Sequence, residues 1–238
     1  MKNPAAGGGR WIDVQPDRFP QWISEFRRRH ADASATVADG DTVLAGDADG
    51  AVFTARAADG AVAECHVPFA PAAGSSVHDI AAHAAAGRTV GVLLARLGGY
   101  AVGVFDGSPP RLIASKTGSR PVHGRSAAGG WSQHRFARRR EKQVSEALQA
   151  AANAAVTIFA TARLDAVVVG GDRRAIAGLA EDPRLKDIIA RAQDRFLTVP
   201  DPRLAVLREA PRAFLAIRVR LIEPDPNPVA AGHRDHVH

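Results

Sequence analysis

The sequence predicts a mixed α/β fold, in which an antiparallel β-meander precedes alternating helices and strands. Two observations predict it. In the first half, Asp-Gly pairs at residues 49–50 and 59–60 separate short apolar segments, and Asp-Gly is a strong hairpin signal. In the second half, apolar segments of strand length alternate with longer ones whose apolar residues recur at helical spacing. Apolar residues make up 46% of the 238 positions and charged residues 24%, which is typical of a globular chain.

Residues 1–87 are predicted to form a helix and meander region. Pro16-Asp17 begins a helix, and the arginines at 27–29 end it, where cations suit the free carbonyl groups. The other elements predicted here are strands at 42–45, 51–57 and 61–67, a linker at 68–76 and a helix at 77–86.

Residues 88–222 are predicted to form a second domain built around a long helix. That helix is predicted from an apolar stripe that includes Leu148, Ala155 and Phe159. Residues 223–238 contain three prolines and are predicted to be a disordered tail. The elements predicted in the second domain are antiparallel strands at 89–96, 100–106 and 111–115, a loop to residue 130, helices at 132–163, 173–180, 183–195 and 202–209, and further strands at 165–170, 196–199 and 214–221.

The positive charge is concentrated in one segment. Residues 115–142 contain eight basic residues and a single acid, Glu141, a net of +7 against +6 for the whole chain. A basic cluster beside a nearly neutral body is typical of a phosphate-binding surface. The alternatives are a solvated helix face or an acidic protein or lipid surface, but Arg135 to Arg140 contains no interleaved acid. Nucleic acid is therefore the favoured partner.

Several classes of protein are disfavoured by the composition. The single cysteine, Cys65, excludes a disulfide within the chain and lies in an alternating apolar segment, which favours a buried structural thiol. No secretory signal and no membrane-spanning apolar segment is apparent. We expect a cytoplasmic monomer that does not associate with membranes. Because no Cys-x-x-Cys pair is present, we expect no structural zinc site. We also expect no other metal and no cofactor.

One motif carries most of the functional information. Residues 115–143 read SKTGSRPVHGRSAAGGWSQHRFARRREKQ: a strand ending in Ser-Lys-x-Gly-Ser-Arg, a glycine-rich loop ending in Gly-x-x-Gln, and an arginine-rich helix start. These features resemble the actinobacterial VLRF-type branch of the release-factor-like proteins, which is related to the tRNA-cleaving Vms/ANKZF proteins of eukaryotes. The order of elements from Thr89 to Leu221 is also similar to that family's catalytic domain.

The resemblance implies a ribonuclease-H-like catalytic domain and a peptidyl-tRNA hydrolase that frees nascent chains on stalled large ribosomal subunits. Its expected partners are the large subunit, peptidyl-tRNA and rRNA. The resemblance assigns catalysis to Gln133 with Gly129 and Gly130. The concentrated positive charge, with a tryptophan able to stack on a base, predicts RNA binding by Lys116, Arg120, Arg125, Trp131, Arg135, Arg138, Arg139 and Arg140.

The chain departs from the Gly-Gly-Gln tripeptide of class I release factors, because Trp131 and Ser132 separate Gly130 from Gln133. It matches the Gly-x-x-Gln spacing of the Vms-like branch instead. This leaves open whether the peptidyl ester or the tRNA 3′ end is cleaved. Glycines allow the backbone to approach RNA closely, and a neutral amide can orient a water or a ribose hydroxyl without acting as a strong base.

Each of these residues also has a structural interpretation. Gln133 is also compatible with a polar position in the first turn of a helix, and Trp131 with a packing anchor. His123 and His134 flank the loop, and for both an RNA-contact or structural role is favoured over proton transfer.

Two other functions remain as alternatives. One is a module that binds rRNA or tRNA without chemistry. The other is a metal-dependent nuclease using Asp106, Asp165 and Asp172, which lie near predicted strand ends, although helix and turn caps are the favoured role for them. For residues 1–87 we expect a role in docking to the ribosome or to RNA.

Overall fold

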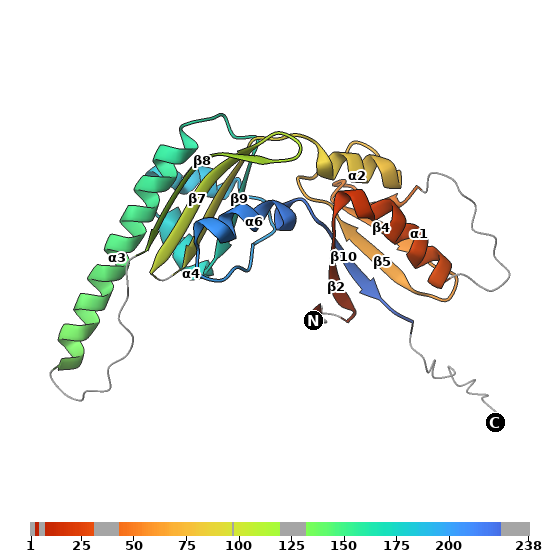
Figure 1. Cartoon of the computed structure of the whole chain (residues 1–238). Coiled ribbons are helices and arrows are strands. Elements are labelled where there is room, and N and C mark those ends of the chain that lie inside the picture. The colour runs from red at the N-terminus through yellow and green to blue at the C-terminus, as the bar shows by residue number, and fades with distance from the viewer. Residues whose placement is uncertain (1–2, 5–7, 31–42, 97, 120–131, 225–238) are drawn as a thin grey trace, which may run out of the picture.

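The chain folds into two lobes that lie beside each other, each with its own β-sheet (Figure 1). This computed structural model describes residues 8–30, 43–96, 98–119 and 141–224 in full, and of residues 3–4 and 132–140 the backbone alone. Within these ranges the fold is a mixed α/β arrangement with two sheets, which confirms the predicted class. The helices, in chain order, are the short η1 (Pro16–Arg18), α1 (Phe19–Arg29), α2 (Val77–Ala85), α3 (Ser132–Phe159), α4 (Arg173–Ala180), α5 (Pro183–Ala190) and α6 (Leu204–Phe214).

The first lobe is a two-layer structure, with α1 and α2 over one face of an antiparallel sheet. In the described residues this sheet has the order β1-β2-β10-β5-β4-β3. The Asp-Gly turns form as predicted: Gly50 and Gly60 have φ of 58° and 90°, values that glycine adopts without strain. The strands are β1 (Asn3–Pro4), β2 (Arg10–Val14), β3 (Ala45–Gly46), β4 (Val52–Arg56), β5 (Val62–His66) and β10 (Ile217–Ile222).

The second lobe has three layers. Its sheet has the order β8-β7-β6-β9 among the described strands, antiparallel except for β6 and β9, which run parallel. Side chains of α3, α4 and α5 pack on one face, and side chains of α6 pack on the other. Because both faces are covered, β6 and β9 are apolar almost throughout. The strands are β6 (Val90–Arg96), β7 (Gly99–Asp106), β8 (Arg111–Ser119) and β9 (Ala166–Gly171).

The last strand does not lie in the second lobe, where the sequence placed it. β10 returns to the first lobe and pairs between β2 and β5. Its side chains alternate between buried Ile217, Val219 and Leu221 and half-buried Arg218 and Arg220, the pattern of a sheet covered on one face only. The expected domain boundaries at 87/88 and 222/223 stay predictions. The pairing of β10 with β2 and β5, however, joins residues from both sides of the 87/88 boundary in one sheet.

A linker residue joins the two lobes. Phe69, in the segment between β5 and α2, is buried in the core of the second lobe, where its ring meets that of Phe214 at 6.0 Å. The guanidinium of Arg88 lies over the Phe69 ring at 4.8 Å. Phe69 also has a φ of 57°, which is unusual for a residue with a side chain. The predicted linker is therefore part of the packed structure.

Some element bounds differ from those predicted. β8 continues to Ser119, and α3 ends at Phe159, where the Thr161 amide and hydroxyl both donate to the Ile158 carbonyl. Residues 196–199 contribute a single bridge, between Leu197 and Gly170, rather than a strand. In the described part of the chain, no helix is long and apolar enough to cross a lipid bilayer.

The buried thiol predicted for Cys65 is confirmed. Its side chain is fully buried in the first lobe, and burial raises the pKa of the thiol to about 12. Because the thiolate is the reactive form, we expect native protein at pH 8 to react with a thiol reagent far more slowly than protein unfolded in guanidinium. A colorimetric thiol assay measures both rates. Equal rates in the two states would contradict this placement.

Candidate functional site

The sequence motif spans the junction of β8, an edge strand of the second sheet, with α3. Lys116 is exposed on β8 and pairs with Val102, whose side chain packs in the core beneath α3. Paired residues of an antiparallel sheet share a face, so Lys116 lies on the face that α3 covers. Gly118 lies against the ring of Tyr100, where a β-carbon would clash. This contact explains the glycine in the Ser-Lys-x-Gly-Ser segment.

The helix that follows begins at Ser132, as predicted, so Gln133 lies in its first turn. Nothing is described of the side chains of Gln133, His134, Arg135, Arg138, Arg139 and Arg140, which have backbone positions in α3. The loop residues Arg120, His123, Arg125, Gly129, Gly130 and Trp131 lie outside the described residues. The assigned roles of all these residues stay predictions.

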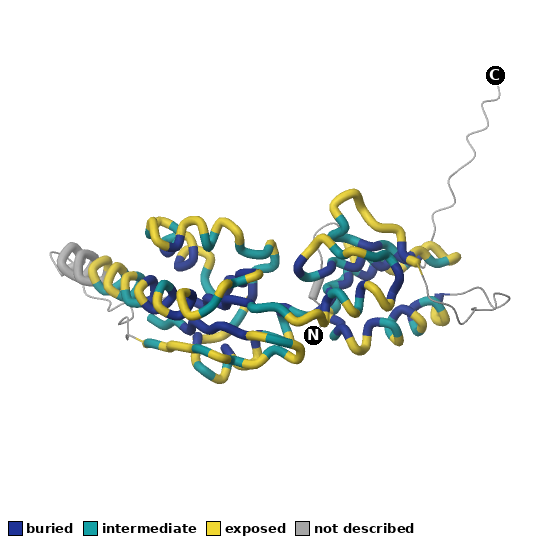
Figure 2. The backbone as a smooth tube through the Cα atoms, turned by 90° about the horizontal axis from the view of Figure 1, so that it is seen from above, coloured by how far each residue is buried: buried dark blue, intermediate teal, exposed yellow. Residues whose placement is uncertain are grey.

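Among the described side chains of α3, the buried ones lie toward the end of the helix. Its 28 residues span about 42 Å, much more than the sheet strands beside it. None of residues 141–150 is buried, whereas buried side chains recur from Ala151 to Phe159 (Figure 2). Alanines at 151, 152, 154 and 155 let this end approach the sheet closely. The start of the helix therefore extends beyond the sheet, as Figure 1 also shows.

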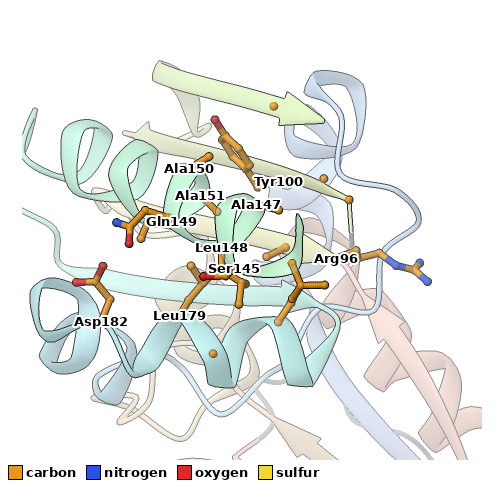
Figure 3. Close-up of a pocket in the computed structure, with 18 of the residues that line it drawn as sticks. Arg96, Tyr100, Ser145, Ala147, Leu148, Gln149, Ala150, Ala151, Leu179 and Asp182 are labelled. Carbon is orange, nitrogen blue, oxygen red and sulfur yellow. The ribbon is translucent and has the colours of Figure 1, made fainter. Parts of the chain in front are cut away.

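A cleft of about 1330 Å³ lies around the middle of α3. The β6–β7 turn with Tyr100 borders one side of the helix, and α4 with Leu179 borders the other (Figure 3). Gly118 and Ser119 also line it, so it adjoins the point where β8 ends and the loop begins. This cleft was not predicted, because its walls come from segments far apart in the chain.

Polar contacts hold the α5 side of the cleft. The guanidinium of Arg184 donates to the Asp182 carboxylate at 2.7 Å and to the Asn153 side chain of α3 at 3.0 Å. The Arg184 side chain and backbone N–H together hold the pKa of Asp182 at about 2. Asp182 is therefore ionised near neutral pH, and the beginning of α5 stays tied to α3.

Residues 88–220 match the family described as Actinobacteria/chloroflexi VLRF1 release factor. The chain belongs to this family. The matched region runs from just before β6 into β10 and includes the whole β8–α3 junction. The resemblance noted in the sequence is thus confirmed, and the family is one of translation release factors.

Comparison with solved structures finds distant likenesses. The archaeal translation termination factor aRF1 is 15% identical, with a TM-score of 0.36, over 66% of this chain and 47% of the factor. An archaeal protein is also 15% identical, with a TM-score of 0.32, over 66% of this chain and 48% of its own. The chain spans about half the length of either structure. No curated protein matches it.

Within the VLRF1 region, the three aspartates of the nuclease alternative do not converge. Asp165 and Asp172 flank opposite ends of β9, roughly 20 Å apart at strand spacing. Asp165 accepts the Thr89 N–H at 2.8 Å, and Asp106 accepts the Thr89 hydroxyl at 2.7 Å. Asp172 accepts the Arg174 N–H at 2.7 Å and caps α4. The described residues also contain no group of three acids, histidines or cysteines that could hold a metal ion.

The capping role of Asp172 predicts a measurable contribution to the free energy of unfolding. Replacing Asp172 with alanine is expected to lower the free energy of unfolding by about 1 kcal/mol, because the Arg174 N–H loses its acceptor. Asp172→Asn retains a side-chain oxygen and serves as the matched control, with a smaller loss. Urea denaturation compares the two. A loss as large in the asparagine variant as in the alanine variant would exclude the cap as the cause.

Proposed function

We propose that this chain is a release-factor-type hydrolase that frees nascent peptides from peptidyl-tRNA on stalled large ribosomal subunits. The observation that carries the proposal is the Gly-x-x-Gln motif within a VLRF1 family region, with Gln133 in the first turn of the long helix that follows β8. The assignment of this lobe to the ribonuclease-H-like type is part of the same proposal.

The anchoring of α3 supports a delivery role. The last third of α3, from Ala151 onward, is packed in the core, whereas the start of the helix carries the basic residues and extends away from the sheet. Lysine and arginine neutralise RNA phosphates and release condensed counterions. In the proposed mechanism these residues dock the start of α3 against rRNA or tRNA, and Lys116 adds a cation on the same face of the sheet.

Gln133 positions the attacking group in this mechanism. An amide carries both donors and an acceptor, so it can hold a water in line with the ester carbonyl without removing its proton. Water adds to the carbonyl carbon and the bond to the tRNA 3′ oxygen breaks. One proton of the water ends on that oxygen as the free hydroxyl, and the other is released to solvent as the peptide leaves as a carboxylate. Backbone N–H groups of the loop are suited to bind the developing oxyanion. Orientation of a ribose hydroxyl toward a phosphodiester is the corresponding step for cleavage within the tRNA 3′ end.

Product analysis tests the function and identifies the bond. Large subunits carrying a labelled peptidyl-tRNA are incubated with the full chain, and the peptide and tRNA are separated on gels. Ester hydrolysis gives free peptide and an intact tRNA 3′ end, whereas tRNA cleavage gives a shortened tRNA and a peptide that retains nucleotides. Persistence of peptidyl-tRNA while the protein co-sediments with the subunits would refute the proposal.

That same outcome would favour the second candidate, an rRNA- or tRNA-binding module without chemistry. The observation behind it is the basic segment at residues 115–142. Such a module is expected to bind large subunits with an affinity that falls steeply with salt, since each neutralised phosphate releases counterions. Any turnover of peptidyl-tRNA would eliminate it.

A further inference from the structure

The sheet of the first lobe has a face that no described helix covers. α1 and α2 pack on the opposite face, over Val219, Cys65 and their neighbours. The register places Arg220 beside Trp11 and Glu64, and Arg218 beside Asp13 and His66. All six side chains therefore point to the same side, which we call the outer sheet face. Each of them is half-buried or exposed.

Planar side chains gather at the centre of this face. The guanidinium of Arg218 lies 4.2 Å from the centroid of the Trp11 ring, and the His66 ring meets Trp11 edge-on at 5.0 Å. Burial lowers the pKa of His66; the Glu64 and Asp47 carboxylates raise it and the charges of Arg218 and Arg220 lower it, so that the net shift is downward. The imidazole is therefore neutral near pH 7 and behaves as an aromatic ring. Trp11, His66 and Arg218 therefore form one contiguous cluster of planar groups, with Trp11 at its centre.

Counted over the outer sheet face and the adjacent Arg195, cations outnumber carboxylates by one, while the Asp47 carboxylate lies near enough to act on His66. Arg195 pairs with Asp13 at 2.8 Å, and Arg220 pairs with Glu64 at 3.2 Å, so each of the two acids is matched by a cation. Arg218 remains in excess, because no carboxylate of the described residues lies within ion-pair distance of it. Aromatic and guanidinium planes combined with surplus positive charge complement unpaired nucleobases and their phosphates.

We propose that the outer sheet face binds single-stranded RNA, with a base stacked on the Trp11–Arg218 group and the adjacent phosphate held by Arg218. This site lies in the lobe away from the start of α3 (Figure 1). It therefore goes beyond the proposed hydrolase site and gives the molecule a second RNA contact at its other end. Duplex RNA binds more weakly, because its bases are paired and its deep groove does not admit these side chains.

The experiment measures binding of a short labelled oligouridine by fluorescence anisotropy, using the full chain with Arg138, Arg139 and Arg140 replaced by glutamine. These replacements reduce binding at α3, so that the outer sheet face dominates the signal. Trp11→Leu and Arg218→Gln are each expected to weaken binding roughly tenfold, as loss of one stacked base or phosphate contact does. Trp22→Leu, on α1 at the covered face, is the matched control and is expected to leave affinity unchanged.

A second readout does not depend on mutating the site. In a chain with Trp22→Phe and Trp131→Phe, Trp11 is the only tryptophan, and stacking of a base is expected to quench its emission as oligouridine is added. Absence of quenching, or equal affinities for the Trp11, Arg218 and Trp22 variants, would overturn the proposal. Equally tight binding of duplex and single-stranded RNA would also overturn the proposal. Failure of peptide release would leave all these results unaffected, so the two proposals are tested separately.

Discussion

Replacing Gln133 with alanine is expected to slow peptide release by on the order of 10²- to 10³-fold, the loss typical of removing one group that orients or stabilises a reacting centre. Binding to the large subunit is expected to stay unchanged, because an uncharged amide contributes little to phosphate contacts. The measurement is the single-turnover rate of peptide release at saturating protein, together with co-sedimentation.

Gln149→Ala is the matched control for this prediction. Gln149 lies on the same helix about 24 Å further along, is exposed, and donates its amide to the Asn153 side chain at 3.2 Å. Its replacement removes the same functional group well away from position 133 and is expected to leave the release rate unchanged. If Gln133→Ala released peptide as fast as Gln149→Ala, the role assigned to Gln133 would be wrong.

Replacing Phe214 with alanine is expected to lower the free energy of unfolding by about 3–5 kcal/mol. Phe214 is 2% exposed, and its ring contacts Phe105 at 5.8 Å and Phe69 at 6.0 Å. The substitution leaves a cavity where a linker residue of the first lobe meets the core of the second. Urea denaturation, followed by circular dichroism, measures the change.

The control for this prediction is Ile113→Ala on β8. Ile113 is 56% exposed, so the loss of its side chain is expected to change stability by less than about 0.5 kcal/mol. Similar losses in the two variants would show that Phe214 does not carry the contact between the lobes.

Local patterns in the sequence predicted most of the elements. The Asp-Gly pairs marked two hairpin turns, and the apolar segments that form β6 and β9 were predicted as strands. The start of α3 at Ser132 was also predicted correctly. These features depend on backbone preferences and burial within a few residues, which one sequence contains.

The pairing of distant segments was harder to predict. β10 was placed in the wrong sheet, although its alternation of Ile217, Val219 and Leu221 with two arginines indicated a strand exposed on one face. That signal distinguishes it from the wholly apolar strands of the second lobe. The insertion of Phe69 into the other core left no local pattern in the sequence, because it depends on how the lobes meet.

The candidate site likewise combines a feature predicted from local sequence with one that depends on contacts between distant segments. Position along the chain located the motif at the β8–α3 junction, but the cleft beside it is formed by the β6–β7 turn, α3 and α4. The outer sheet face joins β2, near the start of the chain, with β10, near its end. Neither surface can be read from one segment, since each depends on the register between strands or on helix packing. The roles of the loop residues, the cytoplasmic location and the monomeric state stay predictions.

The central claim is that the first turn of α3 reaches the scissile end of peptidyl-tRNA. The most direct measurement places a photo-crosslinking amino acid at position 133, and in a second protein at position 149, and irradiates each in complex with stalled large subunits. We predict crosslinks to the 3′ end of the tRNA from position 133 and none from position 149. Crosslinks from position 133 only to protein, or equal tRNA crosslinks from both positions, would contradict the claim.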